Sequence, residues 1–394
     1  MTLRIVHAAD CHLDAPCLSL EASVRERVRA AERSAFARLC ALAIARGVDA
    51  LVLAGDLFDG RSVRLATRMW VISELQRVSD AGVHVVVATG NHDPGDWLEA
   101  LEMEWPAERF TLATGPEPVT VELANGTITA IGHGHERVAD NLVAQLPSAP
   151  RGIPSVAVVH AQVSGSIAAR DRYAPCTPED LATGGYGYVA LGHVHERQQL
   201  SSDPISWYPG CLQSHDIGEP GAKGALLAAI EADGRAEVEF VPLASVRFEV
   251  IELVDPDCTE GQLADRVRER LGEIADGEEI VARVVLSGRS PLAGHLRDPE
   301  QVAAVADELA SELGVLALEL RATGLHAPRD LAEYRGQPHL LGVVLELIER
   351  AQSDQATLES LAPAMLATDE GDRQAYLRSL LADLDLEAAE VLVR

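Results

Sequence analysis

The sequence has few aromatic residues and no long apolar run. Aromatic side chains make up 4% of its 394 residues, although 47% are hydrophobic, so we expect a globular protein with an aliphatic core. No run approaches the roughly twenty apolar residues that span a bilayer. The N-terminus enters a predicted strand without the basic and apolar segments of a signal peptide, so we expect a cytoplasmic protein without a membrane partner.

Cysteine is also sparse and irregularly placed. The six cysteines contain no Cys-x-x-Cys pair, so the sequence predicts neither a zinc knuckle nor a disulfide framework, and the thiols should be reduced. Cys11 lies between two candidate metal ligands, but as the middle residue of a strand end it should point away from them.

Basic residues are outnumbered, with 33 Lys and Arg against 61 Asp and Glu and a net charge of −28. This balance argues against nucleic-acid binding over the whole surface, because phosphate contacts need basic side chains along the binding face. It does not exclude a local basic groove. Metal ions can also supply positive charge at a phosphate site in an acidic protein.

Polar side chains follow five apolar runs, each where a predicted strand ends. Ligands collect at the carboxyl ends of strands in α/β sheets, so we expect these segments to converge on one crevice. They carry two aspartates, four histidines and one asparagine of the kind that bind divalent ions: Asp10, His12, Asp56, Asn91, His160, His193 and His195. This set would hold two ions that share a carboxylate, as in a two-metal hydrolase.

The spacing suggests how the ligands divide between two ions. Asp10 and His12 are two residues apart on a predicted extended chain end, so both should face one ion. Asp56 is the predicted bridge to the second ion. His195 would complete the ligands of the first ion. The ligands of the second ion would include Asn91, His160 and His193.

Two ions about 3.5–4 Å apart can activate water and stabilise charge on a phosphate. His92 follows Asn91 and should point away from the ions, toward the substrate, where it could protonate the leaving oxygen. Asp59 is the best candidate to hold the other nitrogen of His92 and to favour the imidazolium.

Each of these patterns has a structural alternative, because a single Asp-x-His or Gly-His-x-His pattern is common by chance. The conjunction of five patterns, all after apolar runs, favours a site. Residues 132–136 imitate residues 192–196, but a longer buried run precedes the second copy, to which the ligands are assigned. His133 and His135 either line the cleft or have no role there; His7 and His84 are predicted near the core, and His215 near the substrate.

The order of predicted elements indicates an α/β fold. A β-α-β-α-β pattern and a β-rich second half predict a sandwich of two sheets with helices outside, over residues 1–245. A small α+β domain follows over residues 246–325, with helix starts at Thr259 and Asp298. Residues 326–394 predict a linker and two amphipathic helices, with apolar faces that include Leu340, Val344, Leu345 and Ile348, and Tyr376, Leu377, Leu380, Leu381 and Leu384.

These motifs, in this order, resemble the calcineurin-like metallophosphoesterase superfamily. Further segments are similar to its DNA-repair exonuclease branch, which contains SbcD and YhaO-type proteins and relatives of the meiotic recombination nuclease: His7–Asp14, Tyr173–Pro175, Tyr188–His195, Tyr208–Gly210 and Lys223–Gly224. The resemblance covers the first ~215 residues and implies a metallophosphoesterase β-sandwich with a small capping domain.

The resemblance further implies two manganese ions, phosphodiester cleavage in DNA, and C-terminal helices that dock on an SbcC-like ATPase. It also suggests a homodimer formed through helices beside the catalytic face. The preferred hypothesis is therefore a manganese-dependent DNA exonuclease or endonuclease in double-strand-break repair.

Two alternatives stay open. The acidity favours a phosphatase or phosphodiesterase for small-molecule phosphoesters, which would lack a basic groove beside the metals. A non-catalytic platform protein would show degraded ligands, whereas every expected ligand is present.

Overall fold

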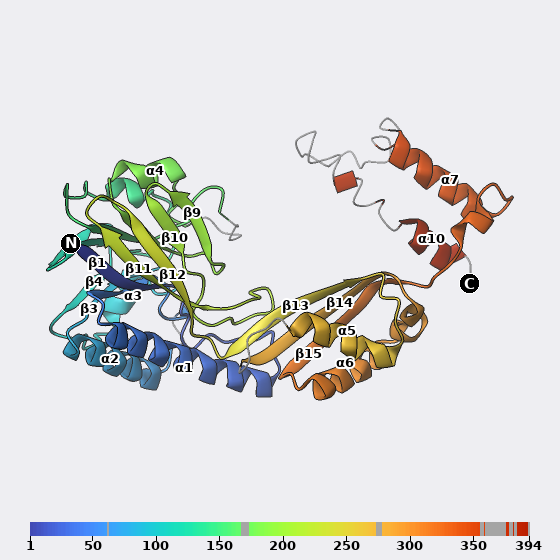
Figure 1. The fold of residues 1–394 in the computed structure, drawn as a ribbon, viewed down its shortest axis with the longest axis horizontal. Helices are drawn as coiled ribbons and strands as arrows, with labels where there is room; N and C mark the ends of the chain where they lie inside the picture. The colour runs from blue at the N-terminus through green and yellow to red at the C-terminus, as the bar shows by residue number, and fades with distance from the viewer. Residues whose placement is uncertain are drawn as a thin grey trace. The chain divides into compact units, whose positions relative to one another are not determined.

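The structure of the protein is a computed structural model that places residues 1–60, 63–166, 173–272, 278–354, 358, 376, 377, 381 and 384–392. The chain divides into two compact units. The first contains Met1–Glu249 and the start of a later strand, through Val281, and the second contains most of the chain from Val250 on (Figure 1).

The first sheet of the first unit has the order β12-β11-β1-β2-β3-β4. Four parallel strands form its centre and one edge: β1 (Thr2–Ala8), β2 (Ala50–Ala54), β3 (His84–Ala88) and β4 (Phe110–Ala113). The antiparallel strands β11 (Gly224–Glu231) and β12 (Ala236–Pro242) complete it. Strands β2 and β3 are apolar on both faces, as expected for strands covered on both sides.

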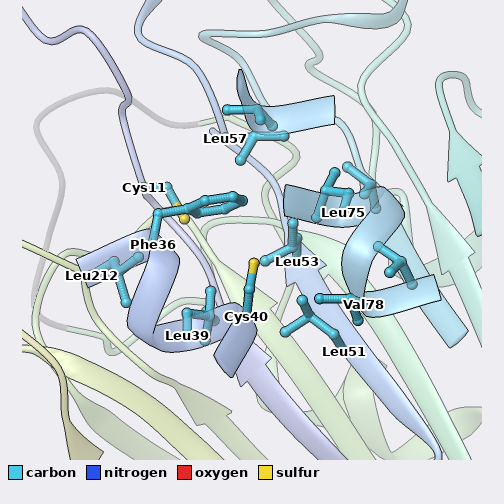
Figure 2. Close-up of a cluster of buried hydrophobic side chains, with 14 of the residues drawn as sticks. Cys11, Phe36, Leu39, Cys40, Leu51, Leu53, Leu57, Leu75, Val78 and Leu212 are labelled. Carbon is cyan, nitrogen blue, oxygen red and sulfur yellow. The ribbon is translucent and has the colours of Figure 1, made fainter. Parts of the chain in front are cut away.

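Helices α1 (Ala22–Arg46) and α2 (Leu65–Asp80) cover one face of this sheet (Figure 1). Figure 2 shows Phe36 and Leu39 of α1 in the aliphatic cluster that also contains Leu51 and Leu53 of β2. Cys11 lies in the same cluster with 2% of its surface exposed, so the prediction that it points away from the ligands is confirmed. All six cysteines are buried and unpaired.

The second sheet has the order β5-β6-β7-β8-β10-β9. Its strands are β5 (Val119–Leu123), β6 (Gly126–Ile131), β7 (Ser155–His160), β8 (Tyr188–Gly192), β10 (Ile205–Tyr208) and β9 (Gln198–Ser202). A buried cluster joins the facing sides of the two sheets. Another lies on the outer face of the second sheet, with η2 (Val143–Gln145) and α4 (Pro178–Thr183). The predicted sandwich of two sheets flanked by helices is therefore confirmed.

The second unit contains most of a three-stranded sheet in the order β13-β14-β15. Its strands are β13 (Val246–Val254), β14 (Glu279–Arg289) and β15 (Ala317–His326), and its core includes α5 (Glu260–Leu271), η3 (Pro291–Arg297) and α6 (Pro299–Leu313). Both predicted helix starts are present. The Thr259 N–H donates to Gln262 Oε1 at 3.0 Å, and Asp298 accepts from the Glu300 N–H at 3.0 Å.

The C-terminal part contains η4 (Leu331–Tyr334), α7 (Leu340–Ser353) and α10 (Leu384–Leu392). Leu341 and Leu345 of α7 pack with Leu386 and Ala389 of α10. Leu340 was predicted on the buried face of α7, but it is 62% exposed, because the buried face is centred on Leu341, Leu345 and Ile348 and Leu340 lies at its border. Leu380 lies outside the described residues. Among the helices that the structure describes, none has the length and apolarity to cross a membrane.

Candidate metal centre

The polar residues that follow β1, β2, β3, β7 and β8 converge at one place in the first unit. Two groups bring their ligand atoms within 4.8 Å of one another: Asp10 with His12 and His195, and Asp10 with Asp56 and His160. Asn91 and His193 adjoin the second group, with the Asn91 Oδ1 3.1 Å from His160 Nε2 and the His193 ring 5.2 Å from that of His160. The structure therefore brings together all seven predicted metal ligands.

The backbone reaches this arrangement through left-handed conformations. Strand β1 ends at Ala8, and Asp10, His12 and Asp56 have φ values of 49°, 43° and 51°. The prediction that Asp10 and His12 share a face on an extended chain is therefore wrong in its geometry, although both side chains reach the site. Hydrogen bonds between the loops that follow β1 and β2 hold this conformation. The Asp10 N–H donates to the Gly55 carbonyl at 3.1 Å, and the His12 N–H donates to the Asp56 carbonyl at 3.0 Å. Such strained residues concentrate at functional sites.

Two glycines permit the close approach of these loops. A Cβ on Gly90 would lie 2.1 Å from Asp56 Oδ1, and a Cβ on Gly55 would lie 2.3 Å from His160 Nδ1. Neither contact can be relieved by a flexible side chain, because Asp56 and His160 are both buried. Glycine is thus required at both positions for the ligands to meet.

Asp93 holds the loop that carries Asp56. Its buried carboxylate accepts from the backbone N–H groups of Leu57 at 2.7 Å and Gly90 at 2.8 Å, and from those of Asp56 and Phe58 at 3.2 Å. Burial and the neighbouring Asp56 raise the pKa of Asp93 to about 7. Asp93 had no predicted role of its own, since Asn-His-Asp also occurs in ordinary turns.

His12 and His195 face each other with their Nε2 atoms 3.1 Å apart. The Nδ1 of His12 donates to Asp59 at 3.1 Å, and the Nδ1 of His195 donates to Glu219. A neutral imidazole that donates from Nδ1 is an acceptor at Nε2, so the two facing nitrogens are both acceptors. This contact is unfavourable unless one ring is protonated or a cation lies between them.

His160 makes a second contact in which acceptor atoms face each other. Its Nδ1 donates to the Ala54 carbonyl at 2.9 Å, which leaves Nε2 as an acceptor. That Nε2 lies 3.1 Å from Asn91 Oδ1 and 3.3 Å from Asp56 Oδ2, two further acceptor oxygens. The donor set, imidazole nitrogens with carboxylate and amide oxygens, suits divalent ions. The residues present therefore fit two cations.

The charges of the site shift the pKa values of its histidines. Burial lowers the pKa of His160, but the Asp56 carboxylate outweighs burial and raises it to about 9. Burial likewise lowers the pKa of His195, and the hydrogen bond to Glu219 raises it to about 9. Burial alone would raise the pKa of Asp56, but the neighbouring His160 holds it well below its usual range. The site thus attracts positive charge strongly.

His92 lies at the exposed side of the site, with 45% of its side chain accessible. Its Nδ1 lies 2.8 Å from Asp59 Oδ1, as predicted, and this hydrogen bond raises the pKa of His92. The His92 ring packs edge-on against that of His12, with centroids 4.6 Å apart. Asp59 therefore contacts both a candidate ligand and the candidate acid.

Other histidines take structural positions. His133 is buried, and its Nε2 donates to the His160 carbonyl at 2.7 Å, so it lies behind the cluster. His135 has 80% of its side chain exposed and pairs with Asp96. His7 is buried, and its Nδ1 lies 3.0 Å from the Tyr188 hydroxyl, as expected for a core position. His84 is half-buried beside Thr111.

Sequence reasoning missed a polar layer behind His195. It comprises Glu219, His215 and Glu32, and only His215 was expected near the site. Glu219 lies in the glycine-rich loop that follows Tyr208, whereas Glu32 sits within the amphipathic pattern of α1. Neither acidic residue follows an apolar strand run, so the signal that found the other residues could not identify them.

Comparisons with known proteins indicate the family of this chain. A family model described as calcineurin-like phosphoesterase matches residues 3–197, and one described as the middle domain of metallophosphoesterase YhaO matches residues 248–323. The uncharacterized metallophosphoesterase YhaO of Bacillus subtilis is 30% identical over 304 residues, which cover 73% of this chain and 72% of that protein.

Two relatives carry names that state an activity. The DNA double-strand break repair protein Mre11 of Methanopyrus kandleri is 25% identical over 380 residues, covering 90% of this chain and 78% of that protein. The D component of the nuclease SbcCD of Rhodobacter capsulatus is 25% identical over 265 residues, covering 55% of this chain and 64% of that protein.

The two-sheet fold and the ligand cluster define a metal-dependent phosphodiesterase, a hydrolase of ester bonds. The chain belongs to the calcineurin-like phosphoesterase family, whose members use a dinuclear divalent metal centre, and it carries a YhaO-like middle domain.

Proposed function

We propose that this protein is a manganese-dependent DNA exonuclease or endonuclease that works with an SbcC-like ATPase in double-strand-break repair. The observation that carries the proposal is the pair of acceptor-to-acceptor contacts, His12 Nε2 with His195 Nε2 and His160 Nε2 with Asn91 Oδ1, at 3.1 Å each. Each contact needs positive charge, from a proton or from a metal ion, and two adjacent metal ions suit phosphodiester cleavage.

The ligands would divide between two ions in the way that the spacing suggests. Asp10, His12 and His195 would hold the first ion, and Asp56 would bridge to the second, which Asn91, His160 and His193 would complete. Divalent ions at these positions would supply Lewis acidity toward the phosphate and lower the pKa of water. Mixed nitrogen and oxygen ligands without thiolate are compatible with manganese.

His92 would donate the proton that the leaving oxygen needs. Its ring is held through Nδ1 by Asp59, which leaves Nε2 free to face the substrate and keeps the pKa raised, so a larger fraction is imidazolium at neutral pH. The carboxylate of Asp59 thereby contacts Nδ1 of both the candidate acid His92 and the candidate ligand His12.

A local concentration of arginine supports DNA as the substrate. Residues 25–68 hold nine of the 33 basic residues and five of the 61 acidic ones, in a chain of net charge −28. Arg29 donates to the Ala15 carbonyl and Arg64 pairs with Asp14, so both border the loop that follows His12. Basic side chains beside the centre would contact phosphates of the DNA backbone.

The ATPase would dock on α7. Leu341, Leu345 and Ile348 are buried, but three other apolar residues of this helix are more than half exposed: Leu340, Val343 and Leu347. Their spacing of three and four residues makes one stripe, as in helices that bind a partner helix. The names of the Mre11 and SbcCD relatives support this partner class.

A homodimer would form through α2, where Leu65 and Met69 are each 63% exposed and one turn apart. Molar mass by light scattering would test it. A Leu65→Glu, Met69→Glu variant should elute as a monomer if this surface pairs two copies.

The nuclease assay compares end-labelled linear duplex DNA with a generic aryl phosphodiester, both with manganese, beside a His92→Ala variant. Cleavage of both substrates by the native chain, with loss of activity in a variant that still binds metal, supports the nuclease and the role of His92. Cleavage of neither substrate, with or without the ATPase, overturns the proposal.

The second candidate is a phosphatase or phosphodiesterase for small-molecule phosphoesters, which the acidic composition favours. It predicts that the aryl ester is cut and DNA is not, even with the ATPase present. A non-catalytic platform is least supported, because all seven predicted ligands and His92 lie together.

A further inference from the structure

Glu219 lies directly behind His195. Its carboxylate accepts from Nδ1 of His195 and from the backbone N–H of His215, the latter at 2.8 Å. Its side chain is only 17% exposed. Burial alone would raise the pKa of Glu219, but the hydrogen bonds from His195 and His215 hold it far below the usual range, so the carboxylate is charged.

The backbone of His195 is held by other groups. The buried Lys223 donates from Nζ to the His195 carbonyl at 2.9 Å, and the Cys211 N–H donates to the same oxygen at 3.2 Å. With the backbone fixed, rotation of the imidazole ring is the freedom that remains. The hydrogen bond from Nδ1 to Glu219 restrains that rotation and turns Nε2 toward His12.

His215 lies beside Glu219, and Glu32 lies on the other side of His215. The Nδ1 of His215 lies 3.7 Å from Glu219 Oε2, and its Nε2 lies 3.7 Å from Oε1 of Glu32, which is 2% exposed. The His215 ring also packs edge-on against that of His12, with centroids 5.7 Å apart. Helix α1, through Glu32, is thereby connected to the loop that carries Glu219.

We propose that Glu219 is a positioning residue that fixes His195 as an Nε2 ligand of the first ion. The inference rests on the two-ion centre of the proposed function. A carboxylate that accepts from the far nitrogen of a ligand histidine sets its tautomer and orientation, and its loss typically weakens metal binding by about 10–100-fold. Asp59 holds His12 in the same way. Because His195 would be a ligand of the first ion alone, the loss of Glu219 should weaken binding of that ion more than binding of the second.

The test is a manganese titration of the whole 394-residue chain, monitored by calorimetry and by electron paramagnetic resonance. The native protein should bind two ions and show the signal of a spin-coupled pair. Glu219→Ala should keep one ion at native affinity and bind the other about 10–100-fold more weakly, so that an isolated-ion signal precedes the coupled one. Glu219→Gln should fall between, because its amide oxygen accepts without a charge.

Glu196→Gln is the matched control. It removes the same charge from the exposed residue next to His195 and should bind both ions as the native chain does. Native binding of both ions by Glu219→Ala overturns the inference. An equal loss of both affinities together with a lower melting temperature also overturns it, because that is the result of a structural role. Failure of the native chain to bind two ions refutes instead the proposed two-ion centre.

Discussion

His12 and His195 meet with their Nε2 atoms 3.1 Å apart, although each already donates from Nδ1 to a carboxylate, Asp59 or Glu219. Two acceptors at this distance repel each other, and either protonation or a metal ion can relieve the repulsion. These two predicted ligands of the first ion are thus arranged around a point that needs positive charge. A metal ion that relieves this repulsion should stabilise the folded protein, so metal binding can be measured through the melting temperature.

Manganese should raise the melting temperature of the protein. A ligand that binds only the folded state at 100 times its dissociation constant adds about 2.7 kcal/mol of stability. Thermal unfolding with manganese and with EDTA measures the difference, and a His12→Ala, His195→Ala variant should lose most of it. An equal melting temperature in both conditions would contradict a metal centre.

His92→Ala should reduce kcat by about 10²–10⁴-fold, the usual contribution of a general acid. Manganese affinity should be nearly unchanged, because the predicted ligands are other residues. His92→Asn should be equally inactive, since an amide cannot supply the proton at neutral pH. Steady-state rates on an aryl phosphodiester, with metal binding by calorimetry, check both statements; a variant with native kcat would remove His92 from the mechanism.

Gly90→Ala should disrupt the centre. The added Cβ would lie 2.1 Å from Asp56 Oδ1, and relief requires a shift of the buried Asp56 loop. Overpacking of this kind costs about 1–3 kcal/mol, and the bridging ligand would be displaced. Gly115→Ala is the control, because nothing lies within 4 Å of its Cβ position. Urea unfolding and manganese titration should separate the two variants; equal behaviour would show that the Asp56 loop adapts.

The buried His7 should make stability depend on pH. Burial lowers the pKa of His7 from its ordinary value of 6.5 to about 3. Below pH 6.5 the unfolded chain therefore binds a proton that the folded chain does not, and stability falls by about 1.4 kcal/mol per pH unit until pH 3. His7→Gln should lower by one the number of protons taken up on unfolding, so the stability of the variant should fall less steeply with decreasing pH. Urea unfolding at pH 7.0, 6.0 and 5.0 measures both slopes, and parallel slopes would contradict the assignment.

Much of the fold follows from local patterns. The apolar run of residues 155–160 forms β7, and the helical spacing of residues 21–46 forms α1, which begins at Ala22. Apolar runs and helical periodicity involve residues that are close in sequence, so they can be recognised without knowledge of the tertiary structure. The exposed Leu340 shows the limit, because periodicity alone does not say where a helix begins to contact its neighbour.

The sequence by itself determined which polar residues follow the strands, and hence which side chains meet at the candidate metal centre. Only the tertiary structure decided that Asp10 and His12 reach the site through left-handed backbone, and that Glu219 and Glu32 stand behind His195 and His215. The physical reason is distance along the chain. Glu32 and Glu219 are brought together by packing between elements far apart in sequence, and a carboxylate that orients a histidine carries no local pattern of its own.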